Sequence, residues 1–283
     1  MNGVAITRDE LAVWSRYIRE ICGIHLDDSK KYLLETRLGG LLRETGAGSF
    51  SELFHKSRAD MTQALRRKII DAITTNETSF FRDTAPFDLL RHKLIPELID
   101  RRNRAGAGRA PLRFWSAACS TGQEVYSMGI VLKEVLGDLS RYDIRILGTD
   151  ISDQAIGRAS YGCYGRLELD RGMPPELRIR HFAAAGDQWK IRDEIRALAT
   201  FRTLNLLEPF AFPAPFDIIF CRNVAIYFTE SDKVRLFRTL GRWLARDGCL
   251  MVGATESITG LCPELEAKRH LRTVFYQLKE PKP

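Results

Sequence analysis

Residues 113–136 constrain the fold of this 283-residue chain more than any other segment. A short apolar stretch, Arg113–Ala117, leads into a turn that contains Gly122, and an amphipathic helical pattern follows from Val125 to Leu136. This order of strand, glycine turn and helix is how α/β proteins present a nucleotide-like ligand to the carboxyl end of a sheet. The sequence therefore predicts a Rossmann-like α/β domain with a ligand beside this turn.

The residues of the turn favour a nucleoside ligand without phosphates. The turn reads Ser120-Thr121-Gly122 and has no Gly-x-Gly-x-x-Gly pattern, whereas a pyrophosphate needs close backbone approach at several glycines. Asp150 closes the next strand pattern, where a carboxylate is well placed to accept hydrogen bonds from ribose hydroxyls. A dinucleotide is therefore disfavoured, and S-adenosylmethionine fits the pattern better.

Two acids near the turn also have a purely structural interpretation. Thr121 and Glu124 are spaced as a capping box, in which both side chains satisfy free N–H groups at the start of a helix. Asp150, two residues before Ser152, also suits the beginning of a helix. The sequence alone leaves ligand contact and helix capping open for both acids.

The first part of the chain differs in pattern from the rest. Residues 1–75 show only helical periodicity, with capping boxes at Thr7–Glu10 and Ser49–Glu52. Residues 76–111 contain a polar and aromatic segment, a further helix and a Gly- and Ala-rich connector. We expect an all-helical N-terminal domain at 1–75, a linker segment and helix at 76–111, and the sheet domain at 112–283.

From residue 112 onwards strand and helix patterns alternate, which is typical of a mostly parallel sheet. Residues 161–200 interrupt this order. Apolar residues there occupy odd positions on both sides of Asp193-Glu194, which indicates antiparallel strands with one solvent-exposed face. We therefore expect a small antiparallel β insertion at 161–200. The expected elements are strands at 112–117, 143–149, 201–206, 216–221, 248–253 and 273–278, and helices at 122–136, 152–159 and 231–245.

The composition is that of a soluble globular protein, with 45% hydrophobic and 28% charged residues. No apolar run approaches the roughly 20 residues of a membrane span, and the first residues lack the pattern of a secretory signal. The six cysteines form no Cys-x-x-Cys pair, which favours a reducing cytoplasm and argues against a metal site. The net charge of +7 favours an acidic partner, either nucleic acid or a carboxylate-rich protein.

Several segments together resemble the chemotaxis receptor methyltransferases of the CheR type. They occur in the family's order, and the resemblance covers nearly the whole chain, including the helical N-terminal domain and the insertion. Asn-x-Thr-x-Phe-Phe-Arg and Cys-Arg-Asn-Val-x-Ile-Tyr-Phe are specific patterns, whereas the glycine turn alone is not. The matching segments are Asn76–Arg82, Trp115–Glu124, Gly148–Ile151, Asn205–Leu206 and Phe216–Phe228.

The resemblance implies an activity and a setting for it. Members of the family transfer a methyl group from S-adenosylmethionine to glutamate side chains on the cytoplasmic helices of methyl-accepting chemotaxis receptors. The products would be glutamyl methyl esters and S-adenosylhomocysteine. On this basis we expect a cytoplasmic monomer that uses no metal, binds no nucleic acid and does not insert into the membrane.

The resemblance also assigns roles to individual residues. Arg82 and Tyr227 would act at the reacting methyl group, and Asp150 would hold the ribose. Gln123 departs from the family, which commonly has a second acid there, and we expect this change to alter the charge of the pocket. The implied cofactor-binding residues are Asn76, Thr78, Arg82, Glu124, Asp150, Asn205, Leu206, Arg222 and Asn223.

Two basic residues near the start of the second predicted helix are candidates for substrate binding. Lys30 and Arg37 are seven residues apart and so share a helix face, and family members are thought to meet glutamate-rich receptor helices with this region. The alternative is that both side chains are simply solvated.

Other matched residues have structural alternatives when taken alone. Phe80 and Phe81 fit packing better than stacking on adenine, and Arg82 beside Asp83 fits a surface ion pair. Tyr227 lies in an apolar run and fits a core position with a satisfied hydroxyl. The joint occurrence of the segments favours the functional interpretation.

Two other functions compete with receptor methylation. A nucleic-acid methyltransferase would suit the basic charge, but amino methylation of bases usually relies on an Asp/Asn-Pro-Pro-aromatic segment, and this chain has Cys221-Arg222-Asn223-Val224 there. A catalytically silent adaptor that binds S-adenosylmethionine is the second alternative. It is disfavoured because every matched site position is filled.

Overall fold

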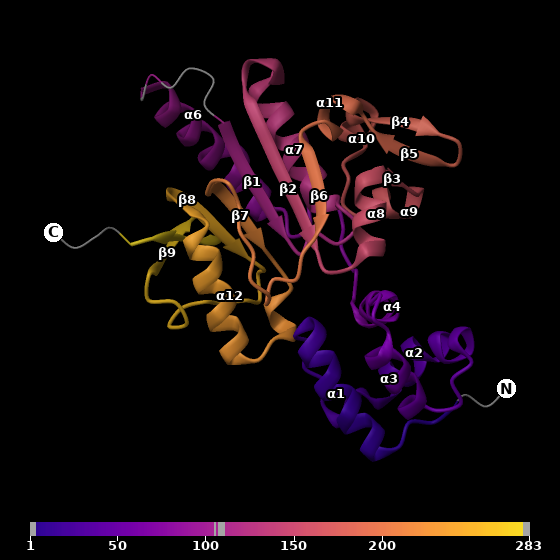
Figure 1. The fold of residues 1–283 in the computed structure, drawn as a ribbon. Helices are drawn as coiled ribbons and strands as arrows, with labels where there is room; N and C mark the ends of the chain where they lie inside the picture. The colour runs from indigo at the N-terminus through magenta and orange to yellow at the C-terminus, as the bar shows by residue number, and fades with distance from the viewer. Residues whose placement is uncertain (1–3, 105, 107–110, 280–283) are drawn as a thin grey trace.

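The structure, a computed structural model, describes residues 4–104, 106 and 111–279. Within these ranges the centre is a seven-stranded sheet with the order β6-β2-β1-β7-β8-β10-β9 (Figure 1). The first five strands in this order are parallel, and β10 pairs antiparallel with β8 and β9, which confirms the mostly parallel Rossmann-like sheet. The strands are β1 (Pro111–Ala117), β2 (Asp143–Asp150), β6 (Ala199–Thr203), β7 (Phe216–Cys221), β8 (Leu244–Val252), β9 (Leu265–His270) and β10 (Thr273–Leu278).

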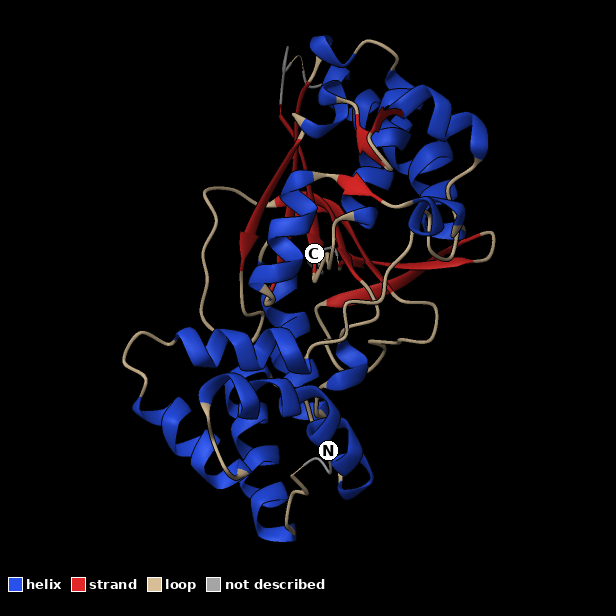
Figure 2. Ribbon diagram, turned by 90° about the vertical axis from the view of Figure 1, so that its right-hand side faces the viewer, coloured by secondary structure: helices blue, strands red, loops and turns tan. Residues whose placement is uncertain are grey.

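The sheet separates two hydrophobic cores (Figure 2). Successive side chains of a strand point to opposite faces, so Phe114 belongs to one core and Trp115 to the other. The first core is shared with α5 to α7, and the second with α12. These elements are α5 (Ala85–Leu89), the π-helical segment η2 (Leu90–Leu94), α6 (Ile95–Arg104), α7 (Gln123–Leu136) and α12 (Glu230–Arg242).

The N-terminal domain is all-helical, as expected, and has a core of its own. Its first helix begins with the predicted capping box, because Thr7 and Glu10 each accept a backbone N–H from the other. At the third helix Ser49 accepts from the Glu52 N–H, but the Glu52 carboxylate reaches the N–H of Gly48 instead of closing the box. The elements are α1 (Arg8–Cys22), the 3-10 turn η1 (Asp28–Lys30), α2 (Lys31–Thr45), α3 (Phe50–Ala59) and α4 (Ala64–Ile73).

The helical domain packs against the carboxyl ends of the parallel strands (Figure 1). The carboxylate of Asp71 in α4 accepts from the Ser152 hydroxyl at 2.6 Å and from the Gln154 N–H at 3.3 Å. Ser152 caps α8 (Asp153–Tyr161), so Asp71 places a negative charge at the positive end of that helix. The two domains are therefore joined directly beside the strand end that carries Asp150.

The insertion contains the expected antiparallel sheet, with the order β3-β5-β4. It also contains three short helices that the sequence pattern did not indicate. The predicted strand pair across Asp193-Glu194 is wrong, because these residues begin a short helix and the next strand, β6, joins the main sheet beside β2. Ile191 and Ile195 are four residues apart, so their spacing fits a helical turn as well as a strand. The elements are β3 (Cys163–Tyr164), α9 (Arg166–Asp170), α10 (Pro175–His181), β4 (Phe182–Ala185), β5 (Gln188–Ile191) and α11 (Asp193–Arg196).

Three further elements differ from the prediction. The helix expected at 231–245 ends at Arg242, because Leu244 already pairs with Phe216 as the first residue of β8. The strand expected at 201–206 runs from Ala199 to Thr203. β9 was not expected, since it is an edge strand with mostly exposed side chains and has no apolar pattern.

The remaining short elements are 3-10 turns, η3 (Leu139–Arg141) and η4 (Ala225–Tyr227). No helix within the described ranges is long and apolar enough to cross a lipid bilayer.

Gly172 is where the insertion meets the segment that follows the helical domain. Its φ is +106°, and a Cβ there would lie 2.2 Å from the carbonyl oxygen of Phe80. Gly186, in the turn between β4 and β5, also has a positive φ of +65° but faces open space. We expect Gly186→Ala to cost about 1–2 kcal/mol for the left-handed backbone alone. Gly172→Ala should cost about 1–3 kcal/mol more, because the contact cannot relax without backbone movement.

Urea unfolding of both variants measures this difference. Equal free energies of unfolding for the two variants would show that a Cβ at residue 172 does not clash with the Phe80 carbonyl oxygen.

Candidate functional site

A cavity of about 270 Å³ lies between the carboxyl ends of the parallel strands and the helical domain. This volume is near the lower end of the range for small-molecule sites, about 300–1,000 Å³. The helical domain contributes one wall through Cys22, Ile24, His25, Leu26, Lys30, Tyr32, Leu33 and Ile73. A cofactor in this cavity would therefore be covered by a domain that the sequence analysis did not place at the site.

The cavity brings together most of the residues that the family resemblance assigned. They come from the segment after α4, the β1–α7 turn, the end of β2, the residues after β6 and the loop after β7. The lining includes Asn76, Thr78, Arg82, Glu124, Asp150, Asn205, Leu206, Arg222, Asn223 and Tyr227, together with Lys30. Arg37 is not among the lining residues.

Asp150 holds the turn that follows β1 while it lines the cavity. Its carboxylate accepts from the Ser120 N–H at 2.8 Å and from the Ser152 N–H at 3.0 Å. Burial raises the pKa of Asp150 above its ordinary value, and the two N–H bonds oppose this shift. Ligand contact and helix support are therefore compatible at this residue, because each oxygen keeps a further lone pair.

Glu124 does not cap α7. The N-cap is Gly122, and the Thr121 hydroxyl bonds to Gln123 instead, so the capping-box alternative is wrong. One oxygen of Glu124 accepts from the Ser116 hydroxyl at 2.7 Å, and the other accepts from Arg222 Nη1 at 2.9 Å.

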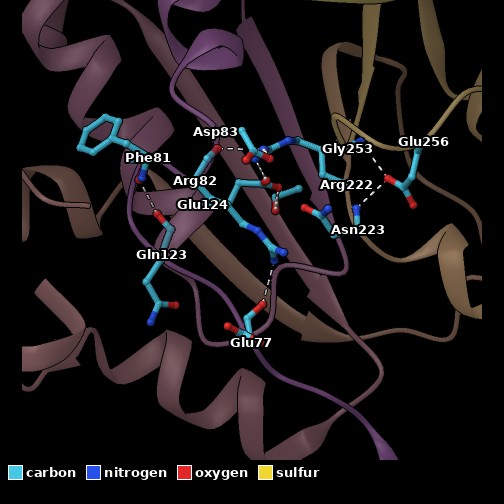
Figure 3. Close-up of polar contacts among 12 residues, drawn as sticks. Glu77, Phe81, Arg82, Asp83, Gln123, Glu124, Arg222, Asn223, Gly253 and Glu256 are labelled. Atoms are coloured by element: carbon cyan, nitrogen blue, oxygen red, sulfur yellow. Dashed lines mark hydrogen bonds and ion pairs between the residues drawn. The ribbon is translucent and has the colours of Figure 1, made fainter. Parts of the chain in front are cut away.

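Arg222 is the buried centre of this part of the site, with a side chain only 1% exposed (Figure 3). Besides Glu124 it binds Asp83, whose carboxylate lies 2.8 Å from Nη2, and the carbonyl oxygen of Arg82, also at 2.8 Å. Its Nε is buried and has no hydrogen-bond partner in the described structure. Arg222 is among the residues that line the cavity, so a ligand there would lie beside this buried network.

The loop that carries Arg82 is strained and held from both sides. Phe81 and Asp83 have φ of +49° and +54°, in the left-handed region that non-glycine residues seldom adopt. The Phe81 N–H donates to Ser127 Oγ at 3.0 Å, while Arg222 holds the other side of the loop. Because Asp83 pairs with Arg222, the proposed ion pair between Arg82 and Asp83 is wrong.

The guanidinium of Arg82 makes one hydrogen bond among the described residues, from Nη1 to the Glu77 carbonyl at 3.0 Å (Figure 3). Its half-buried side chain lines the cavity and keeps other N–H donors for a ligand.

Phe80 and Phe81 are packing residues, as the sequence favoured. Phe80 makes edge contacts with Tyr164 and Phe182 of the insertion, and Phe81 makes one with Phe87.

Gln123 does not alter the charge of the cavity, because it is not among the lining residues. Its side chain is buried and extends toward Glu168 of the insertion, at 3.5 Å. That expectation was wrong because position 123 faces away from the cavity.

Asn205 joins the two domains at the edge of the cavity. Its side-chain amide donates to the Ile21 carbonyl at 3.2 Å, at the end of α1, and to Glu208 at 3.1 Å. Leu206 beside it is buried and gives the cavity an apolar surface.

Tyr227 lines the cavity from the loop after β7, and its side chain is partly exposed. Its carbonyl accepts the His25 N–H at 3.0 Å, so the helical domain also contacts this loop. Glu256 accepts N–H bonds from Asn223 and Ile226 of the same loop. The sequence analysis did not select Glu256, although an acid shortly after the end of an expected strand was a possible signal.

The two basic candidates for substrate binding differ. Arg37 bonds to the carbonyls of Ile73 and Thr74, at 2.6 and 2.8 Å, and thereby closes the end of α4. Lys30 belongs to η1, before α2 begins, so the two residues do not share a helix face. Lys30 lines the cavity, and a hydrogen bond from a neighbouring serine hydroxyl and the charge of Lys30 are among the causes that lower the pKa of the nearby Asp27 carboxylate.

No group of three His, Cys, Asp or Glu side chains within the described residues is arranged to hold a metal ion. The lining instead combines carboxylate acceptors for hydroxyl groups, the partly exposed Arg82 guanidinium and apolar side chains. This set of groups fits the polar and apolar parts of S-adenosylmethionine.

Removing the Arg222 side chain tests the buried network. Arg222→Ala leaves Glu124, which is 12% exposed, without its cationic partner, and we expect the free energy of unfolding to fall by about 3–5 kcal/mol. Arg58→Ala is the matched control, because Arg58 pairs with Glu20 at 3.0 Å on an exposed surface and should cost less than about 1 kcal/mol.

Urea unfolding of both variants provides the measurement. Similar losses in Arg222→Ala and Arg58→Ala would contradict the central place given to Arg222.

Comparison with known proteins identifies the family. The family model described as "CheR methyltransferase, SAM binding domain" matches residues 76–273, and "CheR methyltransferase, all-alpha domain" matches residues 9–74. A chemotaxis protein methyltransferase of Vibrio parahaemolyticus is 39% identical over 99% of this chain and 100% of its own length. Chemotaxis protein methyltransferase Cher2 of Pseudomonas putida is 38% identical over 93% of this chain and 95% of its own. The chain therefore belongs to the CheR methyltransferase family, whose sheet domain binds S-adenosylmethionine.

Proposed function

We propose that this protein transfers the methyl group of S-adenosylmethionine to glutamate side chains on the cytoplasmic helices of methyl-accepting chemotaxis receptors. The products are glutamyl methyl esters and S-adenosylhomocysteine. The proposal rests on one observation: matched residues from widely separated segments line the same cavity. The names of the relatives, which are chemotaxis protein methyltransferases, support the receptor substrate.

The proposed reaction depends on keeping water out. S-adenosylmethionine, when bound, supplies an electrophilic methyl group on a positively charged sulfur. A carboxylate that attacks this group consumes one negative and one positive charge, and water stabilises the separated charges more than the transition state. Apolar side chains of the helical domain, including Cys22, Leu26 and Leu33, support the proposal because they wall the cavity against solvent.

Cofactor binding is assigned to the walls of the cavity nearest the strand ends. Asp150 accepts from the ribose hydroxyls, and Glu124 holds polar groups of the cofactor. Asn205 and Leu206 flank the adenine. Asn76, Thr78, Arg222 and Asn223 complete the cofactor side of the pocket.

Arg82 and Tyr227 are the proposed catalytic residues. An ionised glutamate needs no general base, so alignment and desolvation supply the rate, with alignment worth at most roughly 7–11 kcal/mol. A guanidinium that clamped both attacking oxygens would weaken the nucleophile. We therefore assign Arg82 to orienting the carboxylate or the cofactor, and Tyr227 to the region of the reacting methyl group.

Two variants separate orientation from cofactor binding. Arg82→Ala should abolish most transfer of labelled methyl groups to receptor-rich membranes while its affinity for S-adenosylmethionine stays within roughly tenfold of wild type. Asp150→Ala should instead lose the cofactor itself. Calorimetric titration measures affinity, and release of labelled methanol in base identifies the ester. A loss of affinity in Arg82→Ala as severe as its loss of turnover would refute this division.

The same assay distinguishes the competing functions. A silent adaptor would bind S-adenosylmethionine and transfer no label. A nucleic-acid methyltransferase would label added nucleic acid with a bond that resists base. Base-labile label on receptors excludes both.

The proposed substrate also determines in which compartment the protein acts and which partners it has. Receptor cytoplasmic helices require a cytoplasmic enzyme, and we propose that it acts as a monomer without metal, nucleic acid or membrane insertion. The two family models end and begin at residues 74 and 76, which supports the proposed division near residue 75. The linker with its helix, 76–111, and the sheet domain, 112–283, keep their proposed limits.

Lys30 is the remaining candidate for contact with the acidic receptor helix. Lys30→Glu should raise the apparent KM for receptor roughly 3- to 10-fold, the effect of about 1 kcal/mol in an exposed ion pair, and leave cofactor affinity unchanged. Lys31→Glu is the matched control, because Lys31 lies 3.8 Å from Glu35 and does not line the cavity. Equal KM values for the two variants would indicate a general charge effect instead.

A further inference from the structure

Three backbone N–H groups converge on the carboxylate of Glu256. Figure 3 shows those of Asn223 and Gly253. Oε2 accepts from Asn223 at 2.7 Å and from Gly253 at 2.8 Å, while Oε1 accepts from Ile226 at 3.3 Å. Glu256 follows β8, whereas Asn223 and Ile226 belong to the loop after β7. The carboxylate therefore ties together the ends of two adjacent strands.

The loop after β7 needs such a partner because its backbone does not follow a regular ladder. Asn223 has a φ of +57°, so its N–H turns away from the strand direction. Converging backbone N–H groups form an anion-binding concavity, and charge-assisted bonds to a carboxylate satisfy them strongly. Glu256 is thus an internal anion that fixes the path of the loop.

Gly253 belongs to the same set of N–H bonds around the Glu256 carboxylate. A Cβ at this position would lie 2.7 Å from Glu256 Oε2 and 2.8 Å from Asn223 Nδ2. The Glu256 carboxylate cannot move away without breaking the bonds that hold the loop, and the backbone N of Asn223 would lie only 3.0 Å from the added Cβ. The absence of a side chain at residue 253 is therefore what allows the carboxylate to reach the Asn223 N–H.

Side-chain packing does not replace these bonds along the whole loop. Ile226 is 51% exposed, so its side chain provides little anchoring next to Tyr227. The carbonyl of Tyr227 receives one bond, from the His25 N–H of the helical domain. The buried Ala225 and the neighbouring Phe228 pack on the second core, so packing holds part of this loop. The backbone bonds that Glu256 accepts hold the part between Asn223 and Ile226.

We propose that Glu256 is a positioning residue for methyl transfer, which acts by fixing the loop that carries Asn223 and Tyr227. This inference rests on the proposed function. Glu256 does not line the cavity, so its effect reaches the reacting groups through the loop. Arg222 precedes Asn223 in the same loop, so the two supports act on different parts of it: Arg222 ties the start of the loop to the Arg82 carbonyl, and Glu256 ties the following backbone to the end of β8.

Glu256→Gln tests this role with little change in shape. The amide presents an NH₂ group to backbone N–H donors, so at least one bond to the loop is lost. We expect kcat for receptor methylation to fall roughly 10- to 100-fold, the usual effect of misplacing a reacting group by a fraction of an ångström to 1 Å. Affinity for S-adenosylhomocysteine should fall less than kcat. Glu256→Asp keeps the charge and should retain more activity than Glu256→Gln.

A double-mutant cycle identifies the route of the effect. If Glu256 acts through Tyr227, then Glu256→Gln should reduce kcat much less in a Tyr227→Phe background than in the wild type. Independent, additive losses would overturn the proposed route through Tyr227.

Glu10→Gln is the control for a structural role. Glu10 accepts N–H bonds from Thr7 at 2.9 Å and Ser51 at 2.8 Å, but it lies in the helical domain away from the cavity. Thermal unfolding followed by circular dichroism should show losses of similar size in both Gln variants, while only Glu256→Gln loses kcat.

The outcomes separate the inference from the proposed function. Wild-type protein that transfers no base-labile methyl group to receptors overturns the proposed function, and the role of Glu256 in it falls as well. Active wild type with unchanged kcat in Glu256→Gln overturns the inference alone. An equal loss of kcat in Glu10→Gln also overturns it, because the effect would then reflect general stability.

Discussion

The placement of one buried guanidinium, that of Arg222, determines how the rest of the site is arranged. It binds Glu124 from the β1–α7 turn, Asp83 from the segment after the helical domain and the carbonyl of Arg82. A buried arginine is tolerated only where such partners satisfy its charge, so the network must form whenever the sheet domain folds. Because the loop with Arg82 contains left-handed backbone on both sides, its strain persists only while Arg222 and Ser127 hold it.

The second constraint is closure by the helical domain. Asp71 joins α4 to the start of α8, the Asn205 amide joins α1 to the residues after β6, and the His25 N–H reaches the Tyr227 carbonyl. These contacts surround the cavity, so the docking of the domain and the shape of the ligand site are not independent. For the proposed reaction, which water slows, a wall supplied by a separate domain is useful because it covers the ligand site.

Much of the fold was predictable from local patterns, because strand and helix periodicities in the sheet domain are strong. Capping at Thr7 and the positions of β1, β2, β7 and β10 followed directly from the sequence. The failures occurred where short patterns fit two structures, as at Ile191 and Ile195, or where exposed residues left no pattern, as in β9. Most residues of the cavity were predictable for a different reason: they lie in segments that resemble the CheR family, and only the β1–α7 turn and Asp150 followed from the strand pattern itself. Arg37 shows the limit of that reasoning, since a basic residue on an expected surface instead closes the end of α4.

The residues that support the site were less predictable than those that line it. Ser127, Asp71 and Glu256 are ordinary polar residues in the sequence, far from the loops they hold, and only the folded chain brings them together. Two of the supports share one chemistry, in which a side-chain oxygen, the hydroxyl of Ser127 or the carboxylate of Glu256, accepts N–H groups from an irregular loop. An irregular loop exposes unpaired N–H groups wherever it leaves the ladder, and buried donors must find acceptors. Arg222 stands at the start of the loop that carries Tyr227 and bonds to the loop with Arg82, so it joins the two loops. Ser127 holds only the Arg82 loop, and Glu256 holds only the Tyr227 loop. A change at Arg222 should therefore displace both loops, whereas a change at Glu256 acts first on its own loop.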